Sequence, residues 1–119
     1  MEDVVHYARR TLIGEIPFEV YVRRSMKFTL GRIVWTRAIN DRVADDIVFA
    51  KFVMDSLKRH ANCDWGEIDN ADKQRNNEAL ENGERLFSAY THHGDRNSKV
   101  WIITESGKSV TTILFPSEY

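Results

Sequence analysis

Residues 46–60 read DIVFAKFVMDSLKRH, and this stretch decides the fold. Its apolar side chains recur close to every 3.6 residues, which predicts an amphipathic helix. Asp45 or Asp46 is suited to cap the first turn, and Lys58 and Arg59 complement the helix dipole in the last. We expect the apolar stripe to form much of the core, at roughly 1.5–3 kcal/mol for each buried side chain. Its members are Ile47, Val48, Phe49, Phe52, Val53, Met54 and Leu57.

A loop dense in reactive side chains follows this helix. Residues 59–67 read RHANCDWGE and combine a base, an imidazole, a thiol, carboxylates and an indole. Loops held by a rigid scaffold often carry function, so this is the first place to look for a site. In a structural interpretation, Trp65 plugs the junction between helix and sheet while Gly66 takes a positive φ. In a functional one, Trp65 is an exposed anchor for a partner.

The residues before the helix predict a strand and a short helix. Residues 28–36 form a strand-like run that Gly31 interrupts, which indicates a bulge or a close backbone approach. Thr36 is a suitable N-cap for a helix that reaches about Val43.

Residues 1–25 read differently from the rest and are interpreted as an N-terminal extension. Val4, Val5 and Ala8 suggest a short helical face. Residues 16–22 alternate apolar and polar side chains, which predicts a strand, and Pro17 favours an edge position for it.

The residues after the loop predict one polar helix and three strands. Asp69 begins the helix and Gly83 ends it as the left-handed C′ residue. Asn76 is a poor helix former, so we expect a tertiary contact to retain it. The strands form a C-terminal three-stranded antiparallel meander over residues 86–90, 100–104 and 110–115. We therefore expect an α+β fold, with two or three helices on one face of an antiparallel sheet, in a single domain over residues 26–119.

Composition limits the classes of function. The chain has 119 residues, 42% of them hydrophobic, and a formal net charge of -1, which is typical of one soluble domain without an overall attraction to nucleic acid. Apolar runs are shorter than the roughly 20 residues of a membrane helix. Glu2 and Asp3 argue against a signal peptide, and the single Cys63 suits a reducing cytoplasm. We expect no membrane association.

Several different short motifs lie at specific spacings through the second half of the chain. They are Arg59-His60, Asp64-Trp65-Gly66-Glu67, Asp72, Asn76, Ala79-Leu80, Gly83, Arg85, Ser88, Tyr90, Trp101-Ile102-Ile103-Thr104-Glu105, Ser109, Thr111-Thr112-Ile113-Leu114, Pro116 and Glu118-Tyr119. This pattern resembles a family of small bacterial proteins often called plasmid-related proteins, which plasmids, integrative elements and phages carry. The resemblance implies a protein of a mobile genetic element, but the family supplies no agreed activity. It also implies that residues 1–25 are absent from close relatives. Cys63, residues 106–108 and Thr36-Arg37 depart from the family pattern.

An enzymatic alternative rests on architecture. Helices followed by a small antiparallel sheet resemble the barnase/RelE-like ribonucleases, which need no metal. His60 would act as general acid or base, and Arg85 would stabilise the developing phosphorane charge. Ser88, Tyr90 and Thr112 would line the site, and Trp101 would stack on an RNA base.

The same side chains also have a purely structural interpretation. His60 would close its helix, Arg85 would pair with Asp64, and Trp101 would lie in the core. A metal site is not expected, because adjacent His92 and His93 on a strand would point to opposite faces. We expect Cys63 to be a loop residue without chemistry, and no cofactor is predicted.

The preferred hypothesis is a non-enzymatic binding protein that contacts a host or defence-system protein, as anti-CRISPR or antirestriction proteins do. The expected binding residues are Arg59, His60, Asp64, Trp65, Glu67 and Arg85. A third class, a small nucleic-acid binder, would use the basic stripe of Arg23, Arg24, Lys27, Arg32 and Arg37. An N-terminal edge strand would also be able to pair two subunits as a homodimer.

Overall fold

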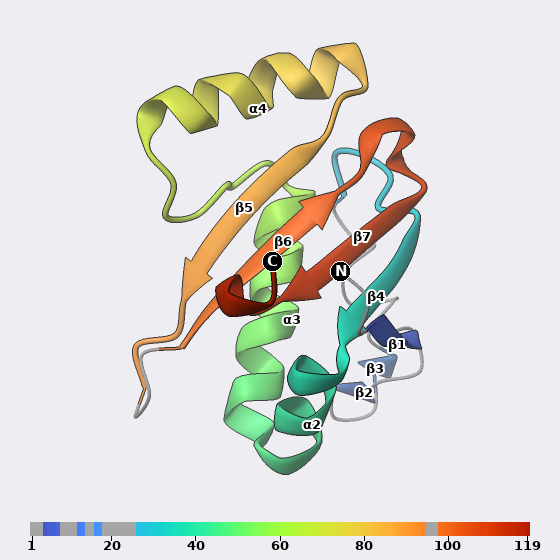
Figure 1. Ribbon diagram of the computed structural model, residues 1–119, viewed down its shortest axis with the longest axis vertical. Helices are drawn as coiled ribbons and strands as arrows, with labels where there is room; N and C mark the ends of the chain where they lie inside the picture. Colours follow the sequence, from blue (N-terminus) through green and yellow to red (C-terminus); the bar gives the residue numbers. More distant parts are fainter. Residues whose placement is uncertain (1–3, 8–11, 14–15, 18–25, 95–97) are drawn as a thin grey trace.

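A mixed β-sheet forms the centre of the protein (Figure 1). The computed structural model describes the backbone of residues 4–7, 12–13 and 16–17, and all of residues 26–94 and 98–119. The strand order is β1-β4-β7-β6-β5. The strands are β1 (Val4–Tyr7), β4 (Arg32–Thr36), β5 (Leu86–Thr91), β6 (Lys99–Thr104) and β7 (Val110–Leu114).

The α+β class and the C-terminal meander are confirmed, and the sheet is mixed. β5 pairs with β6, and β6 with β7, both antiparallel. β4 lies beside β7 in parallel, with Ile33 opposite Thr111 and Trp35 opposite Ile113. A wholly antiparallel sheet was expected. Apolar periodicity indicates which residues form strands, but it carries no information on the direction of a partner that is distant in sequence.

An edge strand does come from the N-terminal residues, but not from the run that was expected. β1 pairs antiparallel with β4, so Val4 and Val5 lie in a strand rather than a helix. Both are β-branched, which favours a strand. A second, two-stranded sheet joins β2 (Leu12–Ile13) to β3 (Ile16–Pro17). Ala8 and the rest of the predicted strand, residues 18–22, lie outside the described residues.

Three helices begin at the caps that the sequence predicts. They are α2 (Arg37–Asp45), α3 (Ile47–Ala61) and α4 (Asn70–Asn82). The side chains of Thr36, Asp46 and Asp69 accept backbone N–H groups of the first turns of α2, α3 and α4 respectively. Gly83 ends α4 with a φ of 71°. Among the described residues, no helix is both long and apolar enough to span a membrane.

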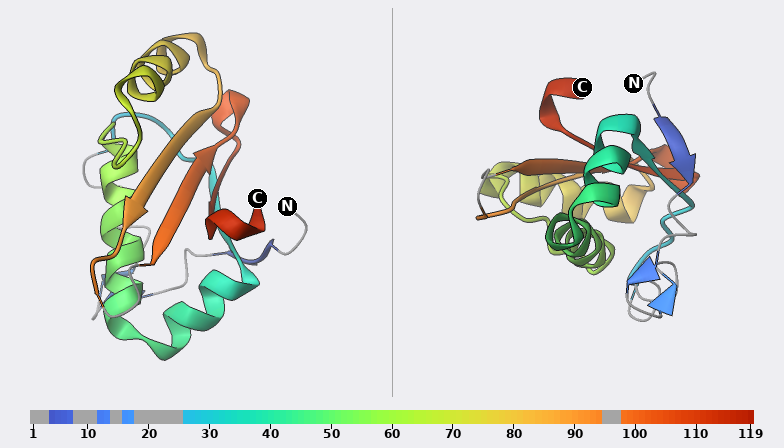
Figure 2. Two further views of the ribbon diagram at one scale, coloured as in Figure 1. Left: turned by 60° about the vertical axis from the view of Figure 1, so that its left-hand side comes forward. Right: turned by 90° about the horizontal axis from the view of Figure 1, so that it is seen from below.

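α3 covers one face of the sheet, and the short 3-10 helix η3 (Pro116–Glu118) lies on the other (Figure 2). Between α3 and the sheet lies the core, to which α2 adds Ile39 and α4 adds Ala79. Gly31, with a φ of 67°, passes so close to the backbone of residues 108–109 that a Cβ would overlap it, so the predicted close approach is confirmed.

The apolar stripe of α3 is narrower than the sequence suggests. Phe49, Val53 and Leu57 are fully buried, but Ile47 is 76% exposed and Val48 59% exposed. Val48 lies about 100° around the helix from Phe49, which places it on the side that faces away from the sheet. The apolar sequence pattern includes Ile47 and Val48 in the stripe, but only the residues that contact the sheet are buried.

Candidate functional site

The loop after α3 covers the backbone edge of β5. The Glu67 N–H donates to the Ala89 carbonyl at 2.7 Å, and the Ala89 N–H donates to the Trp65 carbonyl at 3.4 Å. The Thr91 N–H and hydroxyl both donate to the Glu67 carboxylate, which lowers the pKa of Glu67. An uncovered edge strand invites pairing with other chains. The loop therefore acts here as a partial extra strand.

Asn76 of α4 continues this cover toward the start of β5. Its Nδ2 donates to the Phe87 carbonyl at 2.6 Å, and its Oδ1 accepts the Phe87 N–H at 3.1 Å. The amide thus replaces both hydrogen bonds that a neighbouring strand would make. The predicted tertiary contact of Asn76 is confirmed, and it explains an asparagine inside a helix.

Trp65 is the plug of the junction between helix and sheet. Its side chain is 4% exposed, and its Nε1 donates to Asn77 Oδ1 at 3.0 Å. The indole packs against Phe28 and meets the His60 ring edge-to-face. Gly66 has a φ of 74°, and a Cβ there would overlap the Ala89 carbonyl oxygen. The structural interpretation of this segment therefore holds, and Trp65 offers almost no surface to a partner.

Arg59 and Asp64 lock the same loop from outside. Arg59 Nε lies 2.7 Å from Asp64 Oδ2, and the guanidinium lies 4.8 Å from the centre of the Tyr90 ring. The Tyr90 hydroxyl donates to the Asp64 carbonyl at 2.6 Å. The hydrogen bond from Arg59 lowers the pKa of Asp64. Both charged groups are about half exposed, so the pair itself adds at most about 1 kcal/mol.

His60 lies at the centre of a buried chain of polar side chains. The imidazole is fully buried, with Nδ1 2.6 Å from Ser88 Oγ and Nε2 2.9 Å from Thr104 Oγ1. Thr104 Oγ1 lies 2.7 Å from Thr111 Oγ1, whose hydroxyl donates to the Leu30 carbonyl at 2.6 Å. Each polar group in this buried row of hydrogen-bonded side chains therefore has a partner.

The end of this chain fixes the proton positions along it. A carbonyl only accepts, so the Thr111 hydroxyl must give its proton to Leu30 and accept from Thr104. Thr104 must then accept from His60 Nε2, and Nδ1 accepts from Ser88. Burial lowers the pKa of His60 to about 3, so the ring is neutral, and the hydrogen bonds place its single proton on Nε2.

The four residues of the ribonuclease alternative do not share a cleft. His60 and Tyr90 are fully buried on the face of the sheet that α3 covers. Thr112 lies on the opposite face, because its neighbour Ile113 in β7 points into the core. Arg85 stacks over Tyr119 beyond that second face and pairs with Glu105 at 3.3 Å, not with Asp64. The sheet therefore separates the proposed base from the proposed cation.

The metal and thiol candidates are scattered as well. Among the described residues, no group of three or more His, Cys, Asp or Glu side chains could hold a metal ion. His92 stacks on Phe52 with ring centres 4.9 Å apart, whereas His93 lies near Glu67. Partial burial raises the pKa of the Cys63 thiol, which disfavours the reactive thiolate at neutral pH.

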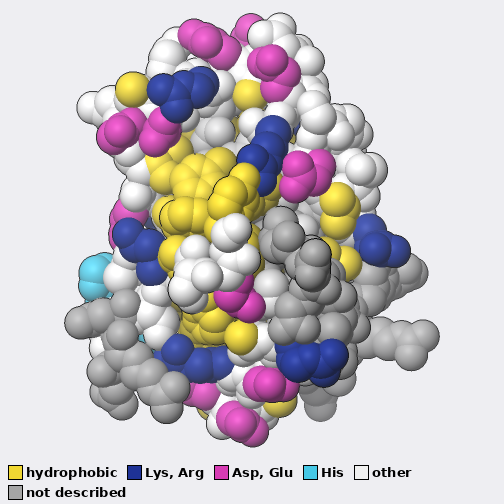
Figure 3. Space-filling view, viewed as in Figure 1, with side chains coloured by type: hydrophobic (Ala, Val, Ile, Leu, Met, Phe, Trp, Pro, Cys, Tyr) yellow, Lys and Arg dark blue, Asp and Glu magenta, His cyan; other side chains and the backbone are white. Residues whose placement is uncertain are grey.

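An aromatic patch lies on the face of the sheet opposite α3, which we call the open face; its other strand residues Ile103, Thr112 and Leu114 are buried. We use this name for Phe87, Trp101 and Tyr119. The Phe87 and Trp101 ring centres lie 5.0 Å apart, those of Trp101 and Tyr119 5.7 Å apart, and both contacts are edge-to-face. Tyr119 is 63% exposed, and the other two rings are half-buried. In Figure 3, hydrophobic side chains gather over the centre of this face.

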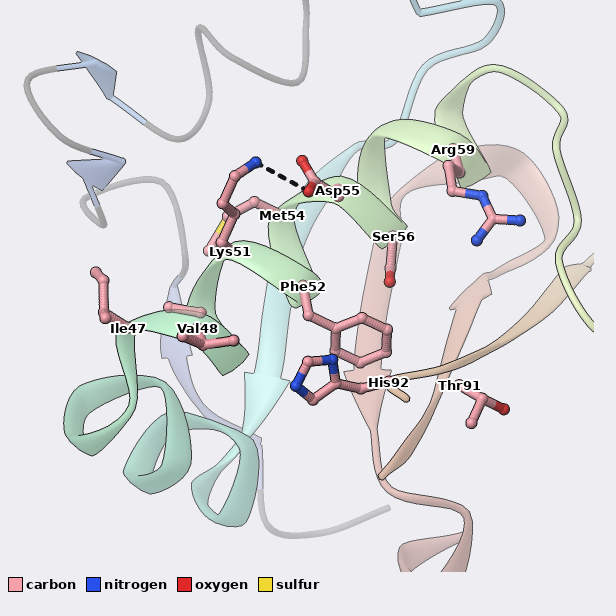
Figure 4. Close-up of a pocket in the computed structure, with 11 residues that line it drawn as sticks. Ile47, Val48, Lys51, Phe52, Met54, Asp55, Ser56, Arg59, Thr91 and His92 are labelled. Carbon is pink, nitrogen blue, oxygen red and sulfur yellow. Dashed lines mark hydrogen bonds and ion pairs between the residues drawn. The ribbon is translucent and has the colours of Figure 1, made fainter. Parts of the chain in front are cut away.

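A groove runs along the outer side of α3, with a volume of about 540 Å³ (Figure 4). One wall is the helix from Ile47 to Arg59, and the other is formed by Thr91 and His92. The stacked rings of Phe52 and His92 meet in its middle. The exposed Ile47 and Val48 lie at one end of the groove, and Arg59 lies at the other.

Comparison with protein-family models, with curated proteins and with solved structures found no match for this chain. The assignment of a site therefore rests on the chain's own geometry.

Sequence reasoning missed the two exposed apolar surfaces. Phe87 and Trp101 alternate with buried neighbours, so their common face was open to prediction. How far η3 and other segments cover this face was not open to prediction, because the covering depends on tertiary packing. The exposure of Ile47 and Val48 was missed because both were assigned to the core.

Proposed function

We propose that this chain is a small non-enzymatic protein that binds another protein through the aromatic patch. The single observation that carries the proposal is a cluster of three aromatic rings, Tyr119 exposed and Phe87 and Trp101 half-buried, on the face of the sheet opposite α3. Clustered aromatic side chains on a surface are costly to leave in water and mark interaction sites. Tyr and Trp are also the residues that most often dominate binding energy.

Charged groups at the border of the patch support a protein partner. Arg85 lies 5.3 Å over the Tyr119 ring and also pairs with Glu105. An apolar centre with an Arg and a carboxylate at its rim is the usual anatomy of a protein interface.

A nucleic acid is a weaker fit to the same surface. Base stacking needs open ring faces, whereas these rings meet edge-to-face, and phosphate binding needs cations that are not already neutralised. In the basic stripe, Arg23 and Arg24 lie outside the described residues, and Lys27, Arg32 and Arg37 are exposed. The net charge of -1 adds no general attraction.

The most concrete form of the proposal is interference with a host defence system in the bacterial cytoplasm. Two features support this form: the motifs over residues 57–119 resemble those of proteins of mobile elements, and the protein is small, at 119 residues. The partner would then be a host or defence-system protein. The ribonuclease alternative gains no support, because a fully buried His60 has no route to a substrate.

Quantitative affinity capture from a bacterial lysate, treated with nuclease, tests the proposal. The bait pair is the wild type and a double variant, Trp101→Thr with Tyr119→Ser, in which threonine keeps strand propensity. Ile47→Ser is the matched control, because it removes an apolar side chain that is even more exposed on the other side of the sheet.

We expect one protein that the wild type and Ile47→Ser enrich and that the double variant enriches at least about tenfold less, which corresponds to about 1.4 kcal/mol. Equal enrichment by all three baits would show that the aromatic patch does not bind the captured protein.

A further inference from the structure

The groove beside α3 has a regular pattern of charge along one wall. Val48, Lys51, Asp55 and Arg59 follow one another at spacings of three and four residues, so they form one line along the helix. The line is apolar at its first residue and then alternates positive, negative and positive. It extends over twelve residues, or roughly 18 Å, which is about the length of a three-turn helix.

The apolar part of the groove is both exposed and structured. Ile47 and Val48 remain largely exposed, and the Phe52 and His92 rings stack to hold the two walls together. Lys51 and Asp55 form an ion pair at 3.1 Å with side chains 65% and 46% exposed, so exchanging this pair for pairs with a ligand costs little.

We propose that this groove is a second docking site and that it binds an amphipathic helix of another protein. The bound helix would place large apolar residues against Ile47, Val48 and Phe52. Along one edge it would carry an acid, a base and an acid at four-residue spacing, opposite Lys51, Asp55 and Arg59; Arg59 would keep its pair with Asp64, which is about half exposed, and share its charge with the ligand. Charge complementarity and groove length together select this occupant.

Other occupants match the wall less well. An added strand needs a free backbone edge, whereas the α3 wall consists of side chains. An anionic membrane surface needs a basic face, and here Asp55 lies between the two cations. A second copy of α3 in antiparallel orientation, centred between Lys51 and Asp55, would set Val48 opposite Lys58 of the other copy rather than opposite an apolar residue.

The inference goes beyond the proposed function and does not depend on it. α3 lies on one face of the sheet and the C-terminal segment that ends in Tyr119 on the other (Figures 1 and 2), so the two surfaces can be occupied at the same time. A protein with both would bridge two partners. Loss of one surface would leave binding at the other unchanged.

Fluorescence anisotropy with two labelled synthetic peptides tests the proposal. Each peptide has about four helical turns, with Leu at i, i+3, i+7 and i+10. One carries Glu, Lys and Glu along the edge of the Leu stripe at four-residue spacing, and the other carries Lys, Glu and Lys at the same positions. The full chain is titrated as wild type, Val48→Asp, the double variant Lys51→Glu with Asp55→Lys, and Tyr119→Ser.

We expect the wild type to bind the first peptide at least about fivefold tighter than the second, and the double variant to reverse this preference. Val48→Asp should reduce binding at least tenfold, and Tyr119→Ser should leave it unchanged. Isotope-labelled chain should show the largest amide shifts along α3.

Four results would overturn the proposal. They are absence of binding, equal affinity for the two peptides, shifts centred on the aromatic patch, and binding to anionic lipid vesicles that Val48→Asp abolishes. Sedimentation provides one more check: a wild-type dimer that Val48→Asp converts to monomer would assign the groove to a second copy and also contradict it.

Discussion

The two faces of the sheet use side chains in opposite ways. On the face that α3 covers, His60, Ser88 and Thr104 are buried and joined by hydrogen bonds. On the open face, Trp101 and Tyr119 are aromatic and partly or largely exposed. Residue types that suggest chemistry are therefore buried in the fold, whereas two aromatic side chains on the other face remain partly or largely exposed. Burial and partners decide the role of a side chain here, not its type.

The largest expected effect is on the covered face. Trp65→Ala removes a buried indole and its hydrogen bond to Asn77, so we expect a loss of about 3–5 kcal/mol in the free energy of unfolding. Urea denaturation followed by circular dichroism measures it. Tyr119→Ser is the control on the open face and should change stability by less than about 0.5 kcal/mol. Similar losses in the free energy of unfolding for both variants would show that Tyr119 contributes to stability as much as Trp65 does, which would contradict the comparison.

A pH titration of stability examines His60 directly. The folded pKa is lowered to about 3 while the unfolded value stays near 6.5, so the unfolded state alone binds the proton between these values. Stability is then full above about pH 6.5 and falls below it by about 1.4 kcal/mol per pH unit. Between pH 6.5 and 5 we expect a loss of about 2 kcal/mol.

His60→Gln serves as the control for that titration, because it keeps a polar side chain but does not titrate. Its stability should change much less over the same range, whatever its stability at pH 7. The carboxylates of Asp64 and Glu67, with lowered pKa values, contribute mainly below this window. A wild-type curve parallel to that of His60→Gln would mean that His60 is not buried as described.

A matched pair of threonines gives a smaller effect. Thr104→Val leaves both His60 Nε2–H and the Thr111 hydroxyl oxygen without a partner inside the core, so we expect a loss of about 1–3 kcal/mol. Thr112→Val replaces a side chain that is buried on the other face of the sheet and lies outside the hydrogen-bonded chain of His60, so it should cost less than about 1 kcal/mol. Thermal unfolding of the two variants side by side tests the order, and a larger loss for Thr112→Val would refute it.

The sequence was informative where a local signal carries the structure. The three helix caps, the left-handed Gly83 and the C-terminal meander follow from short motifs and periodicity. Asn76 was flagged because it is a poor helix former, and its contact with β5 explains it. Such signals act over a few residues, so they can be read without the fold.

What depends on distant contacts was not predictable. The parallel pairing of β4 with β7 joins residues about 80 positions apart. The burial of His60 required knowing that Ser88 and Thr104 would meet it. The aromatic patch needed the position of the last residue, Tyr119, over Trp101. The candidate site was therefore placed in the loop, where residue types pointed, and not on the open face.

The indole N–H signals of the protein provide the most direct test of the central claim. The chain has three tryptophans: Trp35 and Trp65 donate to Asn40 and Asn77, and Trp101 lies in the patch. A two-dimensional ¹⁵N–¹H spectrum would be recorded while the captured partner is added. We predict that the Trp101 indole signal shifts or broadens and that the Trp65 signal keeps its position. A shift of the Trp65 signal with an unchanged Trp101 signal would contradict the account.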